Sequence, residues 1–441
     1  MTGSMMMMSS HSRVVATTGP TLTYYLDAGA LGAFPGVAIT SSATFNGTTK
    51  YLSSTGSAFT QAGDFTVEGW FYPSSVTGTH SLFTLGTETT GRYIWFLNGA
   101  VINSNLYGAS SVVYNTSLSI NTWYHIAVVR SGSTVTLYVN GTADATTDTQ
   151  AGAIGNGALN IGADSSGATF FAGNMSNFRI LSSALYSGAS FTVPTATLRA
   201  ITGTQFLAPL TANPFMDVSS NLLTVNNATG TVTSAIAPSL TAATTDVTGN
   251  YTLSYDNTSG RISWVSTQGG IFRSTFSGDA INAYITGGPD WSTQQSYTVF
   301  MGYKLTGTSN YGRLLNSNTG SPDWLMGGYG SSPKAYYANG VTINLSGATK
   351  DVTWHLDWAR FNISSSVGDL FSVTSSQPTS TPAYTTTNSG IGAFNQLKLF
   401  SKSDGNECAA GDIAFVRVWN GAMTTAQMQA EWTAFHARVG F

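Results

Sequence analysis

One strand–turn–strand pattern occurs twice in this chain, and it restricts the fold more than any other feature of the sequence. The first copy is "NTWYHIAVVRSGSTVTLYVNG" (residues 121–141), and the second is "DVTWHLDWARFNISSSVGDLFSV" (residues 351–373). In each copy an apolar run begins after a Thr-Trp pair and ends at an Arg, and a Ser/Gly turn leads into a second apolar run. Residues 134–139 alternate Val and Leu with Thr and Tyr, the period-two pattern of a half-buried strand. Both copies therefore predict antiparallel β-hairpins.

The blocks around the two hairpins also repeat, and they keep the same order. "DFTVEGWFY" (64–72) corresponds to "SYTVFMGYK" (296–304), and "AGNMSNFRILSSAL" (172–185) corresponds to "AGDIAFVRVWNGAM" (410–423). The distance along the chain between the two members of a pair changes only slightly from block to block. Chance alternation seldom preserves the order of several blocks over so long a stretch. We therefore interpret the chain as a diverged duplication.

One position fits this duplication badly. When the Trp residues of the two hairpins, Trp123 and Trp354, are aligned, Asp357 falls on the position of Ile126. A carboxylate in the place of a core isoleucine would have to leave water at a high cost. We therefore expect the second strand to be slipped or more exposed at this point.

The composition is compatible with β-rich domains and excludes several classes of function. The chain has 441 residues, long enough for two domains. Only 8% of the residues are charged, against roughly 25% in an average soluble domain, so Ser, Thr, Asn and Gly must form much of the surface. A net charge of −3 without any basic run argues against nucleic-acid binding. No window approaches 18 apolar residues, so we expect no membrane insertion.

Four stretches carry a resemblance to a known family. "FNGTTKYLS", "DFTVEGWFYP", "WYHIAVVRSGSTVTLYVNG" and "FAGNMSNFRI" together resemble the laminin-G-like, concanavalin A-like jelly-roll family. The resemblance is strong over residues 38–198 and weak over 250–441. "ALYSGASFTVPTATLRAITGTQFLAPL", "FMDVSSNLLTVNN" and "LTYYLDAG" are similar to regions beside such modules in virion proteins of marine phages and other aquatic viruses.

This resemblance implies an all-β fold with two tandem concanavalin A-like (laminin-G-like) jelly-roll sandwiches. Each sandwich would pack two antiparallel sheets about 10 Å apart around a shared core. The expected divisions are an N-terminal arm with a lead-in strand (1–37), sandwich 1 (38–198), a linker (199–244), and sandwich 2 with a C-terminal helix (245–441).

The sequence predicts one helix, near the C-terminus. In "TTAQMQAEWTAFHAR" (424–438), Thr424 or Thr425 can act as the N-cap. Met428, Trp432 and Phe435 follow at positions i, i+4 and i+7 and form an amphipathic stripe. We expect this helix to pack against its own sandwich, with docking to a partner as the alternative.

The acidic residues are poorly placed for a glycosidase, a class of enzyme that uses related sandwiches. Retaining glycosidases need two carboxylates about 5 Å apart in one cleft. The sequence has four Glu, and the nearest acidic neighbours are Asp64 before Glu68 and Asp404 before Glu407. We interpret His125 and His355 as core or sheet-face histidines, because both lie inside apolar strands. No catalytic residue is predicted, and we expect the chain not to be an enzyme.

Two sets of residues are candidates for ligand binding. Aromatic side chains in or beside Gly/Pro loops can stack on sugar rings, although they can also close the ends of a core. The candidates of this kind are Trp291, Trp324, Tyr336 and Tyr337. Laminin-G-like modules can also hold calcium at the sandwich rim, and the resemblance implies Asp144, Asp148 and Asp164 as candidate ligands in loops. Apart from a possible Ca²⁺, no cofactor is expected.

These features favour a non-enzymatic virion structural protein, such as a capsid-decorating, minor capsid or fibre component that acts in assembly or surface attachment. The alternative is a carbohydrate- or receptor-binding lectin on a virion or cell surface, and a glycoside hydrolase ranks third. Expected partners are other virion proteins in a homo- or hetero-oligomeric assembly, and glycans in the lectin case. The expected location is the particle surface.

The N-terminal arm provides the assembly candidates. Met5, Met6, Met7 and Met8 are adaptable apolar side chains that can fill an irregular groove on another protein. The start "MTGSMMMMSSHSR" has no basic region followed by an apolar stretch of secretory length, so no signal peptide is expected. The arm is therefore either a segment covered by a neighbouring subunit or an ordinary flexible tail. Deleting residues 1–20 should leave both sandwiches folded and, in the first case, weaken incorporation into the particle.

Overall fold

The computed structural model describes most of the chain. The described residues are 20–28, 33, 35–212, 215–219, 221–248, 250–256, 262–265, 271–274, 284–291, 295–305, 312–317, 324–329, 332–338, 341–344, 353–373, 377–387, 394–400 and 410–436. In this part of the chain no helix is long and apolar enough to cross a membrane.

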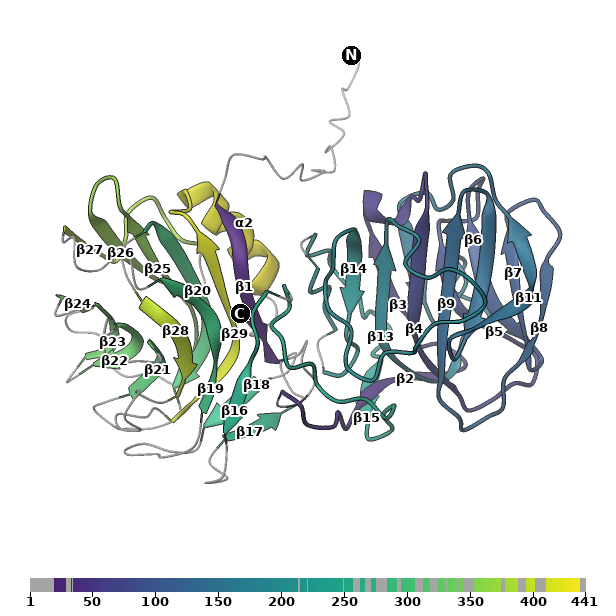
Figure 1. Cartoon of the computed structure of the whole chain (residues 1–441), viewed down its shortest axis with the longest axis horizontal. Helices are drawn as coiled ribbons and strands as arrows, with labels where there is room; N and C mark the ends of the chain where they lie inside the picture. Colours follow the sequence, from purple (N-terminus) through teal and green to yellow (C-terminus); the bar gives the residue numbers. More distant parts are fainter. Residues whose placement is uncertain are drawn as a thin grey trace, which may run out of the picture.

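Sandwich 1 consists of two antiparallel sheets (Figure 1). The core of the sandwich is formed by aromatic and aliphatic side chains. Its sheet 1a has the order β11-β10-β9-β4-β13-β2-β15, with β14 also paired to β13, and its sheet 1b has the order β3-β12-β5-β6-β7-β8. The strands are β2 (Ser42–Asn46), β3 (Leu52–Thr55), β4 (Phe65–Pro73), β5 (Thr79–Leu85), β6 (Tyr93–Asn98), β7 (Val101–Leu106), β8 (Val112–Ser117), β9 (Tyr124–Ser131), β10 (Thr134–Val139), β11 (Thr142–Thr149), β12 (Ala158–Ile161), β13 (Ala172–Leu181), β14 (Thr204–Ala208) and β15 (Val232–Ser234). A short 3-10 helix, η1 (Ser57–Phe59), follows β3.

Sandwich 2 repeats this plan. Its sheet 2a has the order β17-β18-β29-β20-β25-β26-β27, with β1 also paired to β29, and its sheet 2b has the order β16-β19-β28-β21-β22-β23-β24. The strands are β1 (Thr21–Asp27), β16 (Ser254–Asp256), β17 (Ile262–Val265), β18 (Ile271–Ser274), β19 (Tyr284–Trp291), β20 (Tyr297–Leu305), β21 (Gly312–Ser317), β22 (Trp324–Tyr329), β23 (Ser332–Ala338), β24 (Val341–Asn344), β25 (Trp354–Asn362), β26 (Val367–Val373), β27 (Tyr384–Thr387), β28 (Phe394–Leu399) and β29 (Gly411–Asn420). The central order β9-β4-β13 in sheet 1a matches β25-β20-β29 in sheet 2a, as the sequence repeat predicts. The predicted all-β fold of two sandwiches is confirmed.

Strand register shows that Asp357 occupies a core position. Gly69 of β4 pairs with Ile126, and Met301 of β20 pairs with Asp357, so the alignment of the two hairpins holds through this strand. Asp357 is buried, and Tyr303 donates its hydroxyl proton to the Asp357 carboxylate at 2.7 Å. The expectation of a slipped or more exposed strand is therefore wrong: a tyrosine of the neighbouring strand forms a hydrogen bond with the carboxylate inside the core.

The two arginines that close the repeated hairpins are not equivalent. In sheet 1a Phe65 pairs with Arg130, and in sheet 2a the corresponding Tyr297 pairs with Phe361. Arg130 donates to backbone carbonyls, for example from Nη1 to the oxygen of Gly152 at 2.6 Å. Arg360, which stands one position out of step with Arg130, donates instead from Nε to Asp369 at 2.9 Å. The similar sequence signal therefore arises from two different structural roles.

The first strand of the chain belongs to the second sandwich. The stretch "LTYYLDAG", expected to lead into sandwich 1, contains most of β1, which pairs antiparallel with β29. In Figure 1 this strand lies beside β29 and helix α2 (Thr425–Phe435), apart from the other early strands. Sandwich 1 is therefore an insertion between β1 and the remaining strands of sandwich 2.

The range expected to be a linker, 199–244, is partly built into sandwich 1. It contributes β14 and β15 to sheet 1a. Between them, the chain passes β3, where the Ser53 amide donates to the Asn226 carbonyl at 3.1 Å and the Asn226 amide returns a bond at 2.7 Å. The same range supplies Leu207 and Leu240 to the apolar cluster of sandwich 2, so the two sandwiches share continuous packing.

Helix α2 confirms the predicted C-terminal helix. Thr424 is the N-cap and forms a capping box with Gln427. The predicted stripe of Met428, Trp432 and Phe435 is buried. The ring of Phe435 lies 4.4 Å from the ring of Phe415 in β29, so the helix packs on its own sandwich.

Candidate functional site

The four aromatic residues predicted as sugar-stacking candidates lie in strands. Trp324 begins β22, is 0% exposed, and donates from its indole nitrogen to the Tyr297 hydroxyl at 2.9 Å. Trp291 ends β19 and is half-buried, with its ring 5.2 Å from that of Phe394. Tyr336 and Tyr337 lie in β23, and their side chains are outside the described residues. Trp291 and Trp324 thus stand at the ends of strands, and Trp324 fits the alternative role of filling the core.

Two of the three predicted calcium ligands lie on a strand. Asp144 and Asp148 are buried residues of β11, whereas Asp164 lies in the loop between β12 and β13. Each carboxylate has its own partners. Asp144 accepts from the Thr116 hydroxyl at 2.6 Å, and Asp148 accepts from the Tyr93 hydroxyl at 2.6 Å.

Hydrogen bonding accounts for the charge of Asp144 without a metal. Burial alone would raise the pKa of Asp144, but bonds from the Thr116 hydroxyl and from backbone amides outweigh this effect and hold its pKa below the usual value. Asp164 likewise accepts from the Ser166 hydroxyl at 2.8 Å and the Ala168 amide at 2.7 Å. Within the described ranges no three His, Cys, Asp or Glu side chains gather into a possible metal site. Calcium binding stays a prediction.

The assembly candidates Met5, Met6, Met7 and Met8 lie outside the described residues.

Glu68 lies in a sealed polar centre on the outer side of sheet 1a. Neighbouring strands place Glu68 opposite Arg179, and Arg179 Nε donates to Glu68 Oε1 at 2.9 Å. His125 Nε2 lies 3.1 Å from Glu68 Oε2, and the Tyr186 hydroxyl donates to the same oxygen at 2.8 Å. The rings of Tyr186 and Phe191 stack 3.5 Å apart next to this centre. Glu68 is 1% exposed, so a substrate cannot reach it in this conformation.

The charges of this centre are mutually compensated. Burial would raise the pKa of Glu68, but the hydrogen bond from His125 and the positive charge of Arg179 hold the pKa below its usual value. The corresponding position in sandwich 2 is Phe300, which pairs with Arg417. There the carboxylate comes from helix α2, since Arg417 Nη1 donates to Glu431 at 2.6 Å. In both sandwiches a glutamate thus neutralises an arginine at the same position of the sheet. The role of these ion pairs is to stabilise the fold.

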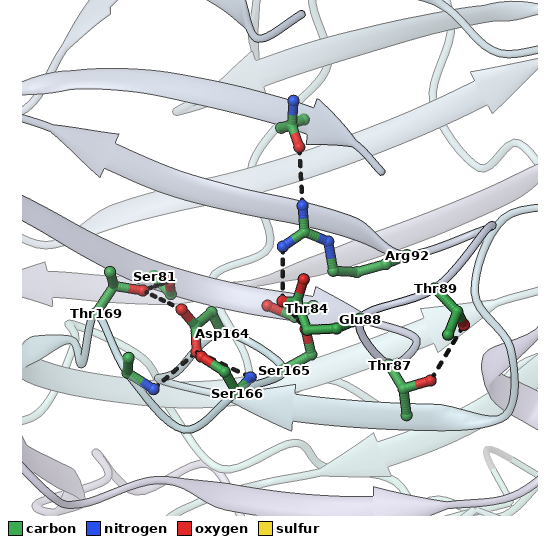
Figure 2. A network of polar contacts seen from close by, with 12 residues as sticks. Ser81, Thr84, Thr87, Glu88, Thr89, Arg92, Asp164, Ser165, Ser166 and Thr169 are labelled. Carbon is green, nitrogen blue, oxygen red and sulfur yellow. Dashed lines mark hydrogen bonds and ion pairs between the residues drawn. The ribbon is translucent and has the colours of Figure 1, made fainter. Parts of the chain in front are cut away.

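An exposed polar cluster at one end of sheet 1b is the best candidate for binding. We call it the Arg92 cluster; its members are Glu88, Arg92, Asn105, Tyr107 and Ser165. Arg92 Nη1 donates to Glu88 Oε1 at 2.8 Å, and Arg92 Nη2 donates to Asn105 Oδ1 at 2.9 Å. The Ser165 hydroxyl also donates to Glu88 Oε1, so the β5–β6 turn is joined to the β12–β13 loop (Figure 2).

The Arg92 cluster combines a fixed polar frame with an exposed ring. The guanidinium carbon lies 5.6 Å from the ring centroid of Tyr107, which is 45% exposed. The Glu88 side chain is 44% exposed, and only its Oε1 is engaged by described residues. The Thr87 and Thr89 hydroxyls lie on the same turn, beside Glu88 (Figure 2). Such a surface offers acceptors, donors and an aromatic face to a ligand rich in hydroxyl groups.

The sequence contained a signal for part of this cluster. In "GTETTGRY" (86–93) an acidic and a basic residue stand four positions apart between two strand patterns, and "LYGAS" (106–110) places an aromatic residue at a turn. What the sequence could not indicate is that these two turns and the loop at Ser165 meet. That meeting depends on β5, β6, β7 and β12 lying together in sheet 1b.

Comparison with known proteins agrees with this architecture. The family model of the concanavalin A-like lectin/glucanases superfamily, Laminin_G_3, matches residues 46–188. Residues 46–188 form a laminin-G-like, concanavalin A-like domain. This range covers most of sandwich 1 and includes every member of the Arg92 cluster. No curated protein sequence matches the chain.

Several solved structures resemble the chain at low sequence identity. A putative carbohydrate binding protein from Bacteroides ovatus is 17% identical (TM-score 0.37), and the match covers 47% of this chain and 62% of that one. A SAP-like pentraxin from Limulus polyphemus is 14% identical (TM-score 0.30; 43% and 95% covered). Domains LG4-5 of the mouse laminin alpha1 chain are 10% identical (TM-score 0.28; 88% and 92% covered). The chain thus spans less than two thirds of the Bacteroides protein.

Proposed function

We propose that this chain is a non-catalytic glycan-binding protein whose Arg92 cluster attaches it to a carbohydrate-bearing surface. The observation that carries this proposal is the exposed ring of Tyr107 beside a carboxylate, an amide and hydroxyl groups already held in place by hydrogen bonds. A frame that is ordered before binding reduces the entropy lost on binding. The partially exposed ring supplies a face on which a sugar can stack.

The acidic residues support binding over hydrolysis. Glu68 and Glu431 are buried in ion pairs with arginines, and Glu407 lies outside the described residues. Glu88 is exposed, and its Oε1 already accepts hydrogen bonds from Arg92 and Ser165. A glycosidase needs one carboxyl group that can donate a proton and a second one beside it. We therefore propose that the chain recognises glycans without cleaving them.

The surface of a virion is the proposed setting. A capsid-decorating, minor capsid or fibre component that binds glycans would serve surface attachment, and the similarity of "LTYYLDAG" and "FMDVSSNLLTVNN" to virion proteins supports this setting. Mass spectrometry of purified particles checks it directly. Peptides of this chain should be enriched with the capsid proteins, and their absence from the particles would remove the virion role without affecting glycan binding.

A glycan array tests the binding proposal. We expect the full chain to bind a subset of glycans, and Tyr107→Ala and Glu88→Gln each to weaken that binding roughly tenfold through loss of stacking or of an acceptor. Tyr384→Ala is the matched control, since Tyr384 is a 41% exposed tyrosine on sandwich 2. If the array shows no binding, or if Tyr107→Ala binds as well as the control, the proposal is wrong. Loss of binding on Trp291→Ala alone would move the site to the position predicted from the sequence.

A further inference from the structure

Strand β1 lies in a slot between strand β29 of sandwich 2 and the passage that leads back into sandwich 2. On one side β1 pairs antiparallel with residues 415–420 of β29. On the other side the Tyr25 amide donates to Asp246 Oδ2 at 3.0 Å, and the Val247 amide donates to the Tyr25 carbonyl at 2.8 Å. We call this arrangement, residues 415–420 with residues 246–248, the β1 slot. A strand bound along both edges has its backbone hydrogen bonds satisfied by its surroundings.

Sandwich 1 contains an equivalent slot, occupied by β14. There the Leu207 amide donates to Asp217 Oδ1 at 2.9 Å, and the Val218 amide donates to the Leu207 carbonyl at 2.8 Å. The two loops that supply these groups have related sequences, "DVSSN" (217–221) and "DVTGN" (246–250). The same Asp-Val pair therefore binds the backbone of one residue of the strand in both slots.

The strands in the two slots are connected differently to the strands with which they pair. Leu207 of β14 pairs with Arg179, and Tyr25 of β1 pairs with the corresponding Arg417. Yet β14 is the next strand of the chain after its partner β13, whereas β1 is the first strand and its partner β29 is the last. The two slots have the same local contacts although the connections along the chain differ. We therefore infer that the local contacts determine which strand binds in the slot.

Leaving the β1 slot empty would be costly. Tyr24, Tyr25 and Leu26 are buried, and the Tyr25 ring lies 4.7 Å from the Arg417 guanidinium and 6.1 Å from the ring of Phe435. Without β1, these contacts and one edge of β29 would face water, and an open strand edge readily pairs with another chain. At a synthesis rate of about 5–20 residues per second, β1 is made roughly 20–80 s before its partner strand β29.

We propose that the β1 slot of one copy accepts residues 21–27 of a second copy of this chain, so that two copies exchange their first strands. The exchanged strand makes the same contacts as the original one, so reciprocal exchange loses none of them and closes a two-fold dimer. Among the described residues, the Gly36 amide donates to the Ala242 carbonyl at 2.9 Å and so holds the chain beside the returning passage. Ala28 and Gly36 are eight positions apart in the sequence, so a crossing between two copies over this length could span at most about 26 Å.

Cysteine pairs at the end of β1 test this exchange in the full-length chain. Thr21 and Asn420 are exposed and directly opposite each other, a spacing that suits a disulfide. The background is Cys408→Ser, which removes the single native cysteine. Two differently tagged copies, one with Thr21→Cys and one with Asn420→Cys, are expressed together. We expect a disulfide-linked dimer of the two tags on a non-reducing gel, with the linked peptides identified by mass spectrometry.

Two controls make the result decisive. Thr21→Cys expressed with Asn98→Cys, an exposed residue at the end of β6 in sandwich 1, should give no linked dimer above background. Thr21→Cys and Asn420→Cys in a single chain show that the pair can form the bond. If the single chain links completely within itself while the separate copies give no more dimer than the Asn98→Cys control, each β1 stays in its own copy and the proposal is overturned.

Discussion

Glu68 illustrates how this chain handles the few charges that it places inside. The carboxylate is buried between Arg179, His125 and Tyr186, and each of these groups stabilises its ionised form. Removing one partner from a buried ion pair leaves the other charged and uncompensated. For this reason the importance of Glu68 lies in the free energy of folding rather than in catalysis.

Glu68→Gln should lower the free energy of unfolding by about 3 kcal/mol, because Arg179 would remain buried without its counter-charge. The folded-state pKa of Glu68 is lowered, so its stabilising contribution is complete above the unfolded pKa of about 4.3 and is lost as the pH falls through the folded pKa. Below about pH 4.3, stability should therefore fall more steeply in the wild-type chain than in Glu68→Gln. Urea denaturation at several pH values measures both effects.

Glu88→Gln provides the matched control for this measurement. Its exposed ion pair with Arg92 should contribute no more than about 0.5 kcal/mol to the free energy of unfolding. An equal loss of stability in both variants would contradict the role assigned to Glu68.

At the scale of elements, the outer face of each main sheet has a different cover. Sheet 1a is covered by the segment around Tyr186 and Phe191, and sheet 2a is covered by helix α2. Both covers meet an arginine at the same sheet position, Arg179 or Arg417. The duplication thus kept the arginine and changed the element that lies against it.

Truncation after Gly421 should expose the rings of Phe415 and Phe300, which contact Phe435 of helix α2 in the intact chain. It would also remove Glu431 from the buried Arg417. We expect a lower melting temperature and lower solubility, measured by calorimetry and by light scattering. Gln429→Ala, on the half-buried part of the helix, should change neither by much. A truncated chain that melts like the intact one would show that the helix serves a partner instead.

At the scale of the whole molecule, the two sandwiches are linked by two passages of the chain. Residues 28–41 carry the chain from β1 into sandwich 1, and residues 235–253 carry it back. The passages lie side by side, since the Ile39 amide donates to the Leu240 carbonyl at 3.0 Å and the Ala242 amide donates to the Val37 carbonyl at 2.7 Å. Sandwich 1 separates β1 from the other strands of sandwich 2. The stability of sandwich 2 therefore depends on residues at the start of the chain.

Deleting residues 1–28 should destabilise sandwich 2 and leave sandwich 1 folded, because only sandwich 2 loses a strand. Hydrogen exchange followed by mass spectrometry should show faster exchange in β20 and β29, with β4 and β13 protected as before. A peptide of residues 20–28 should restore the protection. Deletion of residues 1–20 is the control and should change neither sandwich. Equal loss of protection in β4 would show that the two sandwiches unfold as one unit.

The sequence by itself determined the all-β class, the duplication and the capped C-terminal helix. Period-two alternation at residues 134–139 and the stripe ending at Phe435 are local patterns, and local patterns depend only on neighbouring residues. Tertiary structure decided which distant segments meet. Strand pairing puts Tyr303 beside the otherwise misplaced Asp357, and β22 carries Trp324 into the core although its Gly/Pro-rich surroundings are typical of a loop. The Arg92 cluster and the position of β1 likewise depend on contacts between strands far apart in the chain. A side chain's surroundings in a sheet are set by these long-range pairings, which composition and spacing do not encode.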